Sequence, residues 1–538
     1  MMARWALLAC ALTACTSAPD DETEPTDTVE PELVIASDFQ LTLEPLTLSD
    51  HDPFAGGHQI SLWITPPGGA TQAYDLASGR LQEVPPLEAG TRIGVLIEDG
   101  GTLDLYEPDR TVAYGDVVLS DALDTGEVEL SETVYLPPFA DPGTLLQLDS
   151  IDQSFAAGAA MLDDGTTYLF GGTPLSRLNG GAAVSARDVV LRLTPGPEPT
   201  LTELPVTLPV VTQGAVTASA RAGLTATPFD DGGTTRILVA GGRADWGVIS
   251  NTAPIAHIFD PATEAFIEDV ALPSGRSDHV AVPLSNGDIL LESGLAGNGF
   301  GTRRTLWFHA ADHTVEELEL GDEVGTLYRS AAPLTQGALI CGGVDAGVLL
   351  AEDWVPVDTC VRLDDDGTVL PAPPLPRPLA GHAMVALPNG DVLVTGGTDQ
   401  ALTPGGAPAQ ALDVAYRYDA GSNDWETLPD LQHARFGHTA FVLPGGHVAI
   451  VGGVEAMGTL FNPESGDPVD CAERFSVDTE QFSAQPGCNG HSAGAFGTVA
   501  SHPSAGALVF TGFYRGAEGD FLGTRNVGFA RPIGPPNP

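Results

Sequence analysis

Short apolar runs recur along most of the chain, and turns that contain Gly or Asn separate them. The clearest repeated unit begins with Gly-His, continues through an apolar run, a turn and a second apolar run, and ends with Gly-Gly. Residues 381–397 and 437–453 are two copies of this unit that align without a gap. Paired apolar runs joined by such turns predict antiparallel strands, and no stretch between them has helical periodicity.

Looser copies of the unit extend over the rest of the chain. They end at Gly171-Gly172, Gly241-Gly242, Ser293-Gly294, Gly342-Gly343 and Thr511-Gly512. With the two clear copies this makes seven units, whose endings are about 50 to 70 residues apart. A period near 50 residues is typical of the blades of a β-propeller. Gly-Gly would permit positive φ and close backbone approach at the end of the second strand of each blade.

A third and a fourth apolar run follow each Gly-Gly. The third run commonly ends in an aromatic-Asp or similar pair, as at 258–260, 416–419 and 460–462, and the fourth is clearest at 424–428, where Trp425 would fill the space between blades. The order Gly-Gly, Tyr-Asp, Trp resembles the Kelch motif over residues 144 to 534. We therefore predict an all-β protein with a seven-bladed Kelch-type propeller over 139–534 and a short tail at 535–538.

The ends of the repeat array predict a closed ring. The last copy supplies an inner strand near 493–500, a second at 507–511 and a third at 526–531, but no fourth. The segment 144–149 precedes the first inner strand and can complete this last sheet. Pairing of the two ends would remove the exposed strand edges of an open array.

Residues 33–138 precede the propeller and contain alternating runs at 39–43, 59–63, 92–97 and 126–130. Runs of period two between Gly, Pro and Asp predict a small β-sandwich. It would act as a spacer or as a second binding module.

The first residues resemble a bacterial lipoprotein signal peptide. Arg4 precedes a short apolar stretch, and Leu12-Thr-Ala-Cys15 resembles the lipobox, so residues 1–14 would be removed and Cys15 lipidated. A plain signal peptide cleaved near Ala18 is the alternative. Thr16 follows the cysteine, which favours the outer membrane, and the acidic residues 15–32 would form a disordered tether.

Charge narrows the range of partners. The chain of 538 residues has 72 Asp and Glu, 22 Arg and no Lys, for a net charge of −50. Such a field repels nucleic acid and anionic lipid surfaces, so we expect membrane contact through the lipid anchor only. Base composition of the genome would also explain the missing Lys.

Cysteine spacing predicts disulfides. Four cysteines remain in the body of the chain, as two local pairs: Cys341 with Cys360, and Cys471 with Cys488. An exported chain favours disulfides, and these spacings do not resemble a CxxC metal site.

Arginines recur a few residues before the inner strands. The set is Arg221, Arg276, Arg329, Arg377 and Arg435. A ring of guanidinium groups at the mouth of the channel would bind an anionic ligand through paired hydrogen bonds. The alternative is that each arginine braces a neighbouring blade.

Histidines recur at equivalent positions of the repeat. They are His279, His382, His438 and His491. One histidine per blade does not converge on a point, so this periodicity favours a structural role. We expect no metal site and no cofactor.

Two classes of function fit this architecture. We expect a monomeric, non-catalytic envelope protein that binds a protein or glycan partner, with no catalytic residues. The alternative is a carbohydrate-active Kelch enzyme, because a sandwich followed by a propeller looks like the galactose-oxidase type of copper enzyme. That resemblance implies a Cys-Tyr cross-link, which no motif of this chain matches. An arginine-lined mouth would also suit a mutarotase of the sialic-acid type.

Overall fold

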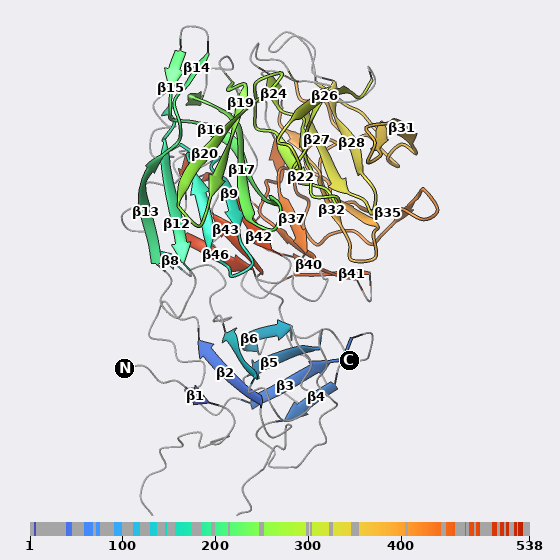
Figure 1. Cartoon of the computed structure of the whole chain (residues 1–538). Helices are drawn as coiled ribbons and strands as arrows, with labels where there is room; N and C mark the ends of the chain where they lie inside the picture. Colours follow the sequence, from blue (N-terminus) through green and yellow to red (C-terminus); the bar gives the residue numbers. More distant parts are fainter. Residues whose placement is uncertain are drawn as a thin grey trace, which may run out of the picture. The chain divides into compact units, whose positions relative to one another are not determined.

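The computed structural model describes part of the chain. The described residues are 5–6, 39–45, 59–67, 72–75, 91–98, 111–118, 130–136, 146–147, 156–173, 184–194, 200–213, 216–246, 252–296, 301, 304–321, 327–345, 354–403, 407–442, 448–457, 469, 473–477, 480–484, 498–502, 506–510, 513–515, 521–523 and 526–530. All elements in these ranges are β-strands (Figure 1), which confirms the all-β prediction. These ranges hold no helix with the length and apolarity needed to cross a membrane.

The chain divides into two compact units. The smaller comprises Met1–Leu145 with Pro195–Pro199 and Phe529–Pro538, and the larger comprises Leu146–Thr194 with Thr200–Gly528.

The smaller unit contains two sheets. The antiparallel sheet has the order β4 (Gln72–Asp75), β3 (Gln59–Thr65), β5 (Arg92–Glu98), β6 (Thr111–Val118). The other has the order β1 (Trp5–Ala6), β2 (Phe39–Pro45), β7 (Leu130–Leu136), with β2 and β7 parallel. Three of the four predicted runs are strands, and β7 begins at the last residue of the fourth run.

The larger unit repeats one antiparallel sheet, which we number 1 to 7 in chain order. Sheet 1 contains β9 (Gly158–Met161), β10 (Thr167–Phe170), β12 (Val189–Thr194) and β13 (Thr200–Thr207). Sheet 2 contains β16 (Ala222–Asp230), β17 (Thr235–Arg243), β19 (Ile255–Asp260) and β20 (Ala265–Ala271). Sheet 3 contains β22 (Val280–Pro283), β23 (Ile289–Glu292), β25 (Arg304–Phe308) and β26 (Val315–Glu319). Sheet 4 contains β27 (Leu327–Pro333), β28 (Ala338–Asp345), β30 (Cys360–Leu363) and β31 (Val369–Ala372), and β29 (Val355–Pro356) pairs with β28.

The remaining sheets follow the same order. Sheet 5 contains β32 (Ala383–Ala386), β33 (Val392–Thr395), β35 (Ala415–Asp419) and β36 (Asp424–Thr427). Sheet 6 contains β37 (Thr439–Val442), β38 (Val448–Val451), β40 (Glu473–Ser476) and β41 (Gln481–Ala484). Sheet 7 contains β42 (Thr498–His502), β43 (Gly506–Phe510), β46 (Asn526–Ala530) and β8 (Leu146–Gln147).

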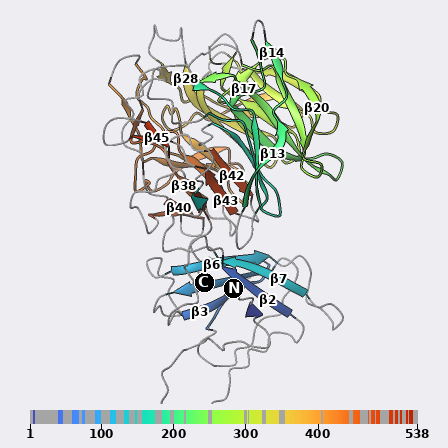
Figure 2. The same cartoon turned by 90° about the vertical axis from the view of Figure 1, so that its left-hand side faces the viewer.

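The first strands of successive sheets lie next to one another in a closed order. The neighbours are β9 and β16, β16 and β22, β22 and β27, β27 and β32, β32 and β37, β37 and β42, and β42 and β9. Both views show the red strands of sheet 7 between orange strands of sheet 6 and green strands of sheet 1 (Figures 1 and 2). This arrangement is consistent with a β-propeller.

Strand pairing joins the two ends of the array. Leu146 of β8 stands opposite Val527 of β46, and Gln147 stands opposite Asn526. The prediction that segment 144–149 completes the last sheet is therefore confirmed. The first strand of that sheet begins at Thr498, later than the predicted 493–500.

Apolar side chains fill the spaces between sheets. Phe170 of sheet 1 and Phe259 of sheet 2 are both fully buried, with ring centroids 5.2 Å apart. Trp425 of sheet 5 packs in the cluster between sheets 4 and 5, and its Nε1 donates to Pro373 O at 2.9 Å. Each sheet thus buries its apolar faces against its neighbours. The prediction that Trp425 fills the space between two sheets is confirmed.

The Gly-Gly segments have the same backbone conformation in sheets 1 to 6. The first residue has φ between 61° and 69° and the second between 89° and 93°, including Ser293-Gly294. The second glycine donates to a carbonyl just before the next sheet, as in Gly397 N to Arg435 O at 2.7 Å. A Cβ atom on Gly396 would lie 2.5 Å from the same carbonyl oxygen. The expected positive φ and close backbone approach are both present.

One predicted third strand is wrong. The third strand of sheet 6 is β40 at Glu473–Ser476, and the predicted run 460–462 lies outside the described residues. The loop after this Gly-Gly is longer than in other copies, and an apolar pattern does not fix loop length.

Segments between the second and third strands pair across neighbouring sheets. β11 (Val184–Ser185) pairs with β18 (Asp245–Trp246), and β34 (Ala409–Gln410) pairs with β39 (Ala456–Met457). Three further short pairs are β14 (Val211–Gln213) with β15 (Val216–Ala218), β21 (Arg276–Ser277) with β24 (Leu295–Ala296), and β44 (Phe513–Arg515) with β45 (Phe521–Gly523). The pair β11–β18 links sheet 1 to sheet 2, and the pair β34–β39 links sheet 5 to sheet 6.

One of the two predicted disulfides is present in the described residues. Cys341 and Cys360 stand opposite each other on β28 and β30 and are bonded, with both residues buried. Cys471 and Cys488 lie outside the described residues, as does the predicted lipidation site Cys15.

Candidate functional site

The five predicted arginines occupy three different kinds of position. The first kind of position lies three residues before the first-strand residue at the level of Gly-Gly (or Ser-Gly): Leu224, His279 and His438 in sheets 2, 3 and 6. The arginines at this position are Arg221, Arg276 and Arg435. Arg329 itself faces Gly342, so it occupies the position that a histidine holds in other sheets. Arg377 lies in the connection between sheets 4 and 5, where its side chain is 38% exposed and its Nη2 lies 3.4 Å from Asp399. The sequence spacing did not distinguish these three kinds of position.

Arg435 is held inside its own sheet. Its Nη1 donates to Gly452 O at 2.9 Å, and its Nε and Nη2 donate to Glu473 Oε1 at 3.2 and 2.8 Å. Glu473 also accepts from the backbone N–H groups of Gln432 and His433, at 2.6 and 3.1 Å. The pair therefore ties the chain that enters sheet 6 to the third strand of that sheet.

Arg276 and Arg329 are buried in the same way. Arg276 Nη1 donates to Leu291 O at 2.6 Å and reaches Arg304 O at 3.3 Å. Arg329 donates through Nε and Nη2 to Glu292 Oε2, at 3.0 and 2.8 Å, and thereby joins sheet 4 to sheet 3. These contacts are those of the bracing alternative, and ligand binding by these arginines stays a prediction.

Arg221 is buried and forms no ion pair with a carboxylate among the described residues, although Asp269 raises its pKa against the effect of burial. Its Nη1 donates to Gly241 O at 3.3 Å, while Nε and Nη2 have no hydrogen-bond partner. His257 on the third strand of sheet 2 stands opposite Val239, which lies two residues before Gly-Gly. In sheet 6 the equivalent third-strand residue is Glu473, opposite Ile450. Burial lowers the pKa of Arg221 to about 10, and burial together with Arg221 lowers the pKa of His257 to about 4. A neutral histidine thus stands where sheet 6 has a glutamate.

The recurring histidines form contacts between sheets. His438 Nε2 lies 2.8 Å from Thr395 Oγ1 of sheet 5, and His279 Nε2 lies 2.9 Å from Thr225 Oγ1 of sheet 2. His382 is buried beside Gly342 of sheet 4 and neither ring nitrogen has a partner. These neighbours are those of a structural role. His491 lies outside the described residues.

A ring of backbone hydrogen bonds lies one residue before the histidine position. Gly223 N donates to Ala156 O at 2.8 Å, Asp278 N to Gly223 O at 2.7 Å, Gly381 N to Tyr328 O at 2.9 Å, and Gly437 N to Gly381 O at 2.9 Å. All six residues have φ between 54° and 69°. We call them the axial ring, because they join successive sheets at the first strands, which are nearest the axis. The Gly of the Gly-His dipeptides is the sequence feature that marks this ring.

Three members of the axial ring are not glycine. Ala156, Asp278 and Tyr328 have φ of 56°, 54° and 55°, which costs about 1 kcal/mol for each residue with a Cβ. Asp278 and Tyr328 belong to adjacent sheets 3 and 4. Strained backbone of this kind is often found at functional sites, which makes these two side chains candidates for a functional role.

Asp278 and Tyr328 differ in exposure and in partners. The Asp278 carboxylate is 31% exposed, and Arg243 binds it through Nη1 and Nη2 at 3.1 and 3.4 Å. Tyr328 is a partly buried residue, and its hydroxyl is buried without a hydrogen-bond partner. Burial raises the pKa of Tyr328; the Asp278 carboxylate acts in the same direction, and Arg243 opposes it. These three side chains form an electrostatically coupled group at the axial ring.

Tyr328 also borders an apolar cluster contributed by sheets 3 to 6. Its ring centroid lies 5.6 Å from that of Phe436 and 6.5 Å from that of Trp354, whose Nε1 is buried without a partner. The cluster contains Leu295, Leu327, Val344, Trp354, Ala380, Leu402, Ala409, Ala411, Phe436, Val454 and Met457. The residues that pack next to Tyr328 at the axial ring are therefore apolar.

Sequence reasoning missed a second set of arginines, on the third strands. Arg192, Arg362, Arg417 and Arg474 each stand opposite the residue three before Gly-Gly. Arg192 pairs with Glu264, and Arg417 pairs with Glu480, each in the turn of the following sheet. Glu264 and Glu480 both have positive φ, 51° and 55°. A register alignment of the third strands would have identified this set.

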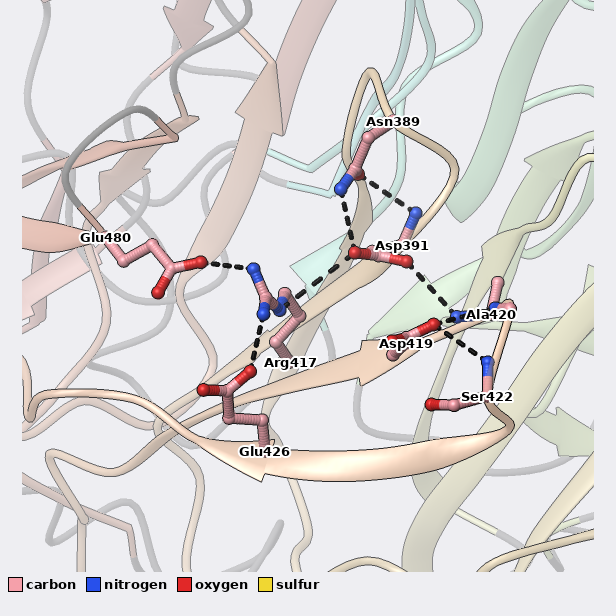
Figure 3. Close-up of polar contacts among 9 residues, drawn as sticks. Asn389, Asp391, Arg417, Asp419, Ala420, Ser422, Glu426 and Glu480 are labelled. Atoms are coloured by element: carbon pink, nitrogen blue, oxygen red, sulfur yellow. Dashed lines mark hydrogen bonds and ion pairs between the residues drawn. The ribbon is translucent and has the colours of Figure 1, made fainter.

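Arg417 is the centre of a cluster of three carboxylates (Figure 3). It contacts Glu480, Glu426 and, at 3.9 Å, Asp391. The other carboxylate oxygen of Asp391 accepts from Ala420 N at 3.1 Å and so fixes the turn that follows β35. This cluster ties sheet 5 to sheet 6 far along the strands from the axial ring.

Comparison with known proteins gives fold resemblance only. No protein-family model and no curated protein matches the chain. A solved structure titled "Structure of YjhT" is 15% identical, with a TM-score of 0.43, and covers 64% of this chain and 99% of its own. A fungal alcohol oxidase of the AA5 family, in complex with copper, is 15% identical with a TM-score of 0.48, and the match covers 70% of this chain and 74% of that one.

Among the described residues, no group of three or more His, Cys, Asp or Glu could hold a metal ion.

Proposed function

We propose that the larger unit is a seven-bladed Kelch propeller that recognises carbohydrate at the axial ring. The seven sheets in closed order and the six equivalent Gly-Gly conformations support the number of blades. The two sheets of the smaller unit support a β-sandwich over 33–138. Carbohydrate fits both predicted classes of function: it is the glycan that a binding protein would recognise, and it is the substrate of a carbohydrate-active enzyme.

One observation carries this proposal: two adjacent sheets place Asp278 and Tyr328 where the ring otherwise favours glycine. A partly exposed carboxylate near a partly buried tyrosine is a surface that suits a sugar, which offers hydroxyl donors and an apolar ring face. Arg243 holds the carboxylate at the ring. Polar groups on a rigid, hydrogen-bonded frame are pre-organised for binding.

Glycine substitutions test the proposal. Asp278→Gly and Tyr328→Gly each remove a side chain and relieve the positive φ. The first also removes the carboxylate that pairs with Arg243, and the second removes ring packing against Phe436. We therefore expect a lower melting temperature and compare binding on folded protein only. The full-length protein is applied to an array of neutral and acidic glycans. We expect both variants to lose at least ten-fold in affinity for the glycan that the parent protein binds, as for loss of a hydrogen bond to a charged or aromatic anchor.

Ala156→Gly is the matched control, because it relieves the same strain in sheet 1 and removes only a methyl group. Its glycan affinity should equal that of the parent protein. A parent protein that retains no glycan, or glycine variants that retain it fully, would overturn the proposal. Capture of a defined peptide in place of any glycan would favour a protein partner. Chemical change in the recovered sugar would assign the enzyme alternative.

We further propose that the protein is anchored in the outer membrane through Cys15 and is otherwise a monomer. The lipobox-like residues before Cys15 support this location. Labelled palmitate should enter the parent protein, while Cys15→Ala should lose the label and leave the membrane fraction. Equal labelling of both would overturn the anchor.

A further inference from the structure

We propose that the buried guanidinium of Arg221 in sheet 2 binds a chloride ion, in the place that a glutamate oxygen occupies beside two other buried arginines. The ion braces the chain that enters sheet 2. This site does not depend on the proposed carbohydrate function. Three observations support it.

The first observation is what a buried guanidinium requires elsewhere in the larger unit. Nε and Nη2 of Arg435 both donate to one atom, Glu473 Oε1, at 3.2 and 2.8 Å. Nε and Nη2 of Arg329 likewise both donate to Glu292 Oε2, at 3.0 and 2.8 Å. All four side chains are 0% exposed. One negatively charged acceptor atom is therefore enough to bind this edge of a buried guanidinium.

The second observation is that Arg221 presents the same two atoms without an acceptor. The residue is 2% exposed, and within the described part of the chain neither Nε nor Nη2 has a hydrogen-bond partner. Its Nη1 donates to Gly241 O at 3.3 Å, as Nη1 of Arg435 donates to Gly452 O at 2.9 Å. Both guanidinium groups are thus anchored to the first glycine of Gly-Gly, and the difference lies in the acceptor for Nε and Nη2.

The third observation concerns charge. The pKa of Arg221, which burial lowers to about 10, leaves the guanidinium protonated at neutral pH. His257 stands at the register of Glu473, but burial and Arg221 lower its pKa to about 4, so it is neutral there. Asp269 bonds His257, and its side chain is 66% exposed. A buried cation without a close anion is costly, and a bound anion removes this cost.

A monatomic anion matches these requirements. Chloride accepts hydrogen bonds from both N–H groups and needs the space of one acceptor atom, whereas carboxylate and sulfate are larger. A water molecule could accept the same hydrogen bonds, but it does not neutralise the charge. The net charge of −50 keeps anions away from the surface, so a buried cation with open donors is the kind of site that retains chloride.

Chloride titration of the full-length protein tests this site. Sodium chloride replaces sodium gluconate at constant ionic strength, and the melting temperature is measured. A ligand that binds the folded state alone stabilises it progressively above its dissociation constant. We expect the melting temperature of the parent protein to rise by about 2 °C for each ten-fold increase in chloride above that constant.

His257→Glu is the variant that distinguishes this site from a general salt effect. It supplies a carboxylate at the register of Glu473, so the chloride dependence should disappear. Leu370→Glu is the matched control, because it adds the same charge on an exposed residue of sheet 4 and should keep the chloride dependence of the parent protein. Equal chloride dependence in the parent protein and in His257→Glu would overturn the proposal.

Bromide locates the ion directly and needs no variant, so it decides even where His257→Glu does not fold. Crystals of the full-length protein soaked in sodium bromide should show an anomalous peak within hydrogen-bond distance of Arg221 Nε and Nη2. An ordered water at that position without anomalous signal would overturn the proposal. Bromide confined to the protein surface, an adventitious ion only, would also overturn it.

Discussion

Arg435 and Glu473 form an ion pair that is closed to solvent, with Nη2 2.8 Å from Oε1 and both side chains 0% exposed. Removal of one partner leaves an uncompensated buried charge. We expect Glu473→Ala to lower the free energy of unfolding by about 3–5 kcal/mol, measured by urea denaturation. The matched control is Glu319→Ala, which breaks a surface pair with Arg304 in which the side chains are 74% and 50% exposed, and should cost less than about 1 kcal/mol. Similar losses for both variants would contradict the role of burial.

His257→Glu should stabilise the protein. The substitution places a carboxylate beside Arg221 at the register where Glu473 serves Arg435, and Asp269, which now bonds His257, is 66% exposed and stays solvated. We expect a gain of about 1 kcal/mol, seen as a higher melting temperature. His257→Gln has nearly the same size without the charge and should not show this gain. A lower melting temperature for the glutamate variant would show that Arg221 does not need a carboxylate.

Acid should destabilise the fold in a window set by buried histidines. Burial lowers the pKa of His279 to about 3 and of His382 to about 4; Arg276 adds to the effect at His279. For His438, burial, Arg435 and His382 lower the pKa well below its ordinary value. Since the folded pKa lies below the unfolded value of about 6.5, stability is complete above that pH and is lost as the pH falls.

Urea denaturation at about pH 7 and about pH 5 measures this loss, which should be about 1–2 kcal/mol for each such histidine. His382→Gln removes one titrating group and should give a shallower pH dependence than the parent protein. An unchanged free energy of unfolding across this range would contradict the burial of the histidines in solution.

Gly396→Ala should be far more costly than Gly232→Ala. Both glycines have nearly equal positive φ, 61° and 59°, but a Cβ at Gly396 would meet Arg435 O and His438, while nothing lies within 4 Å of one at Gly232. We expect about 1 kcal/mol for Gly232→Ala from φ alone and more than about 2 kcal/mol for Gly396→Ala. Equal melting temperatures would show that close approach between sheets is not what Gly-Gly provides.

The repeat was predictable because its physical requirements are local. A Gly-Gly with positive φ, two apolar runs and a turn specify one sheet whatever its neighbours are, and Ser293-Gly294 keeps the same φ values despite the missing glycine. The pairing of 341 with 360 was also local, since the two cysteines stand opposite each other on adjacent strands. The third strand of sheet 6 was missed because a long loop precedes it.

The candidate site was predictable only in outline. The arginines were found by spacing, but spacing could not show that Arg329 stands in the histidine register or that Arg435 turns toward Glu473. Asp278 directly precedes His279 in the sequence, but its exposure and its contact with Arg243 of sheet 2 depend on the packing of neighbouring sheets. Tyr328 has no sequence feature that marks it, because Tyr328-Arg329 does not resemble Gly-His.

The sequence by itself determined the sheets, because strand patterning and turn residues act between neighbours in the chain. It also indicated the closure of β8 on β46, because the last sheet lacked a fourth strand and segment 144–149 had no sheet of its own. The tertiary structure decided which polar groups remain at the surface. Burial of a guanidinium depends on the acceptor that a distant strand supplies, as Glu292 does for Arg329. For this reason Arg221, Arg276, Arg329 and Arg435 are buried, while the side chain of Asp278 stays partly exposed beside Arg243.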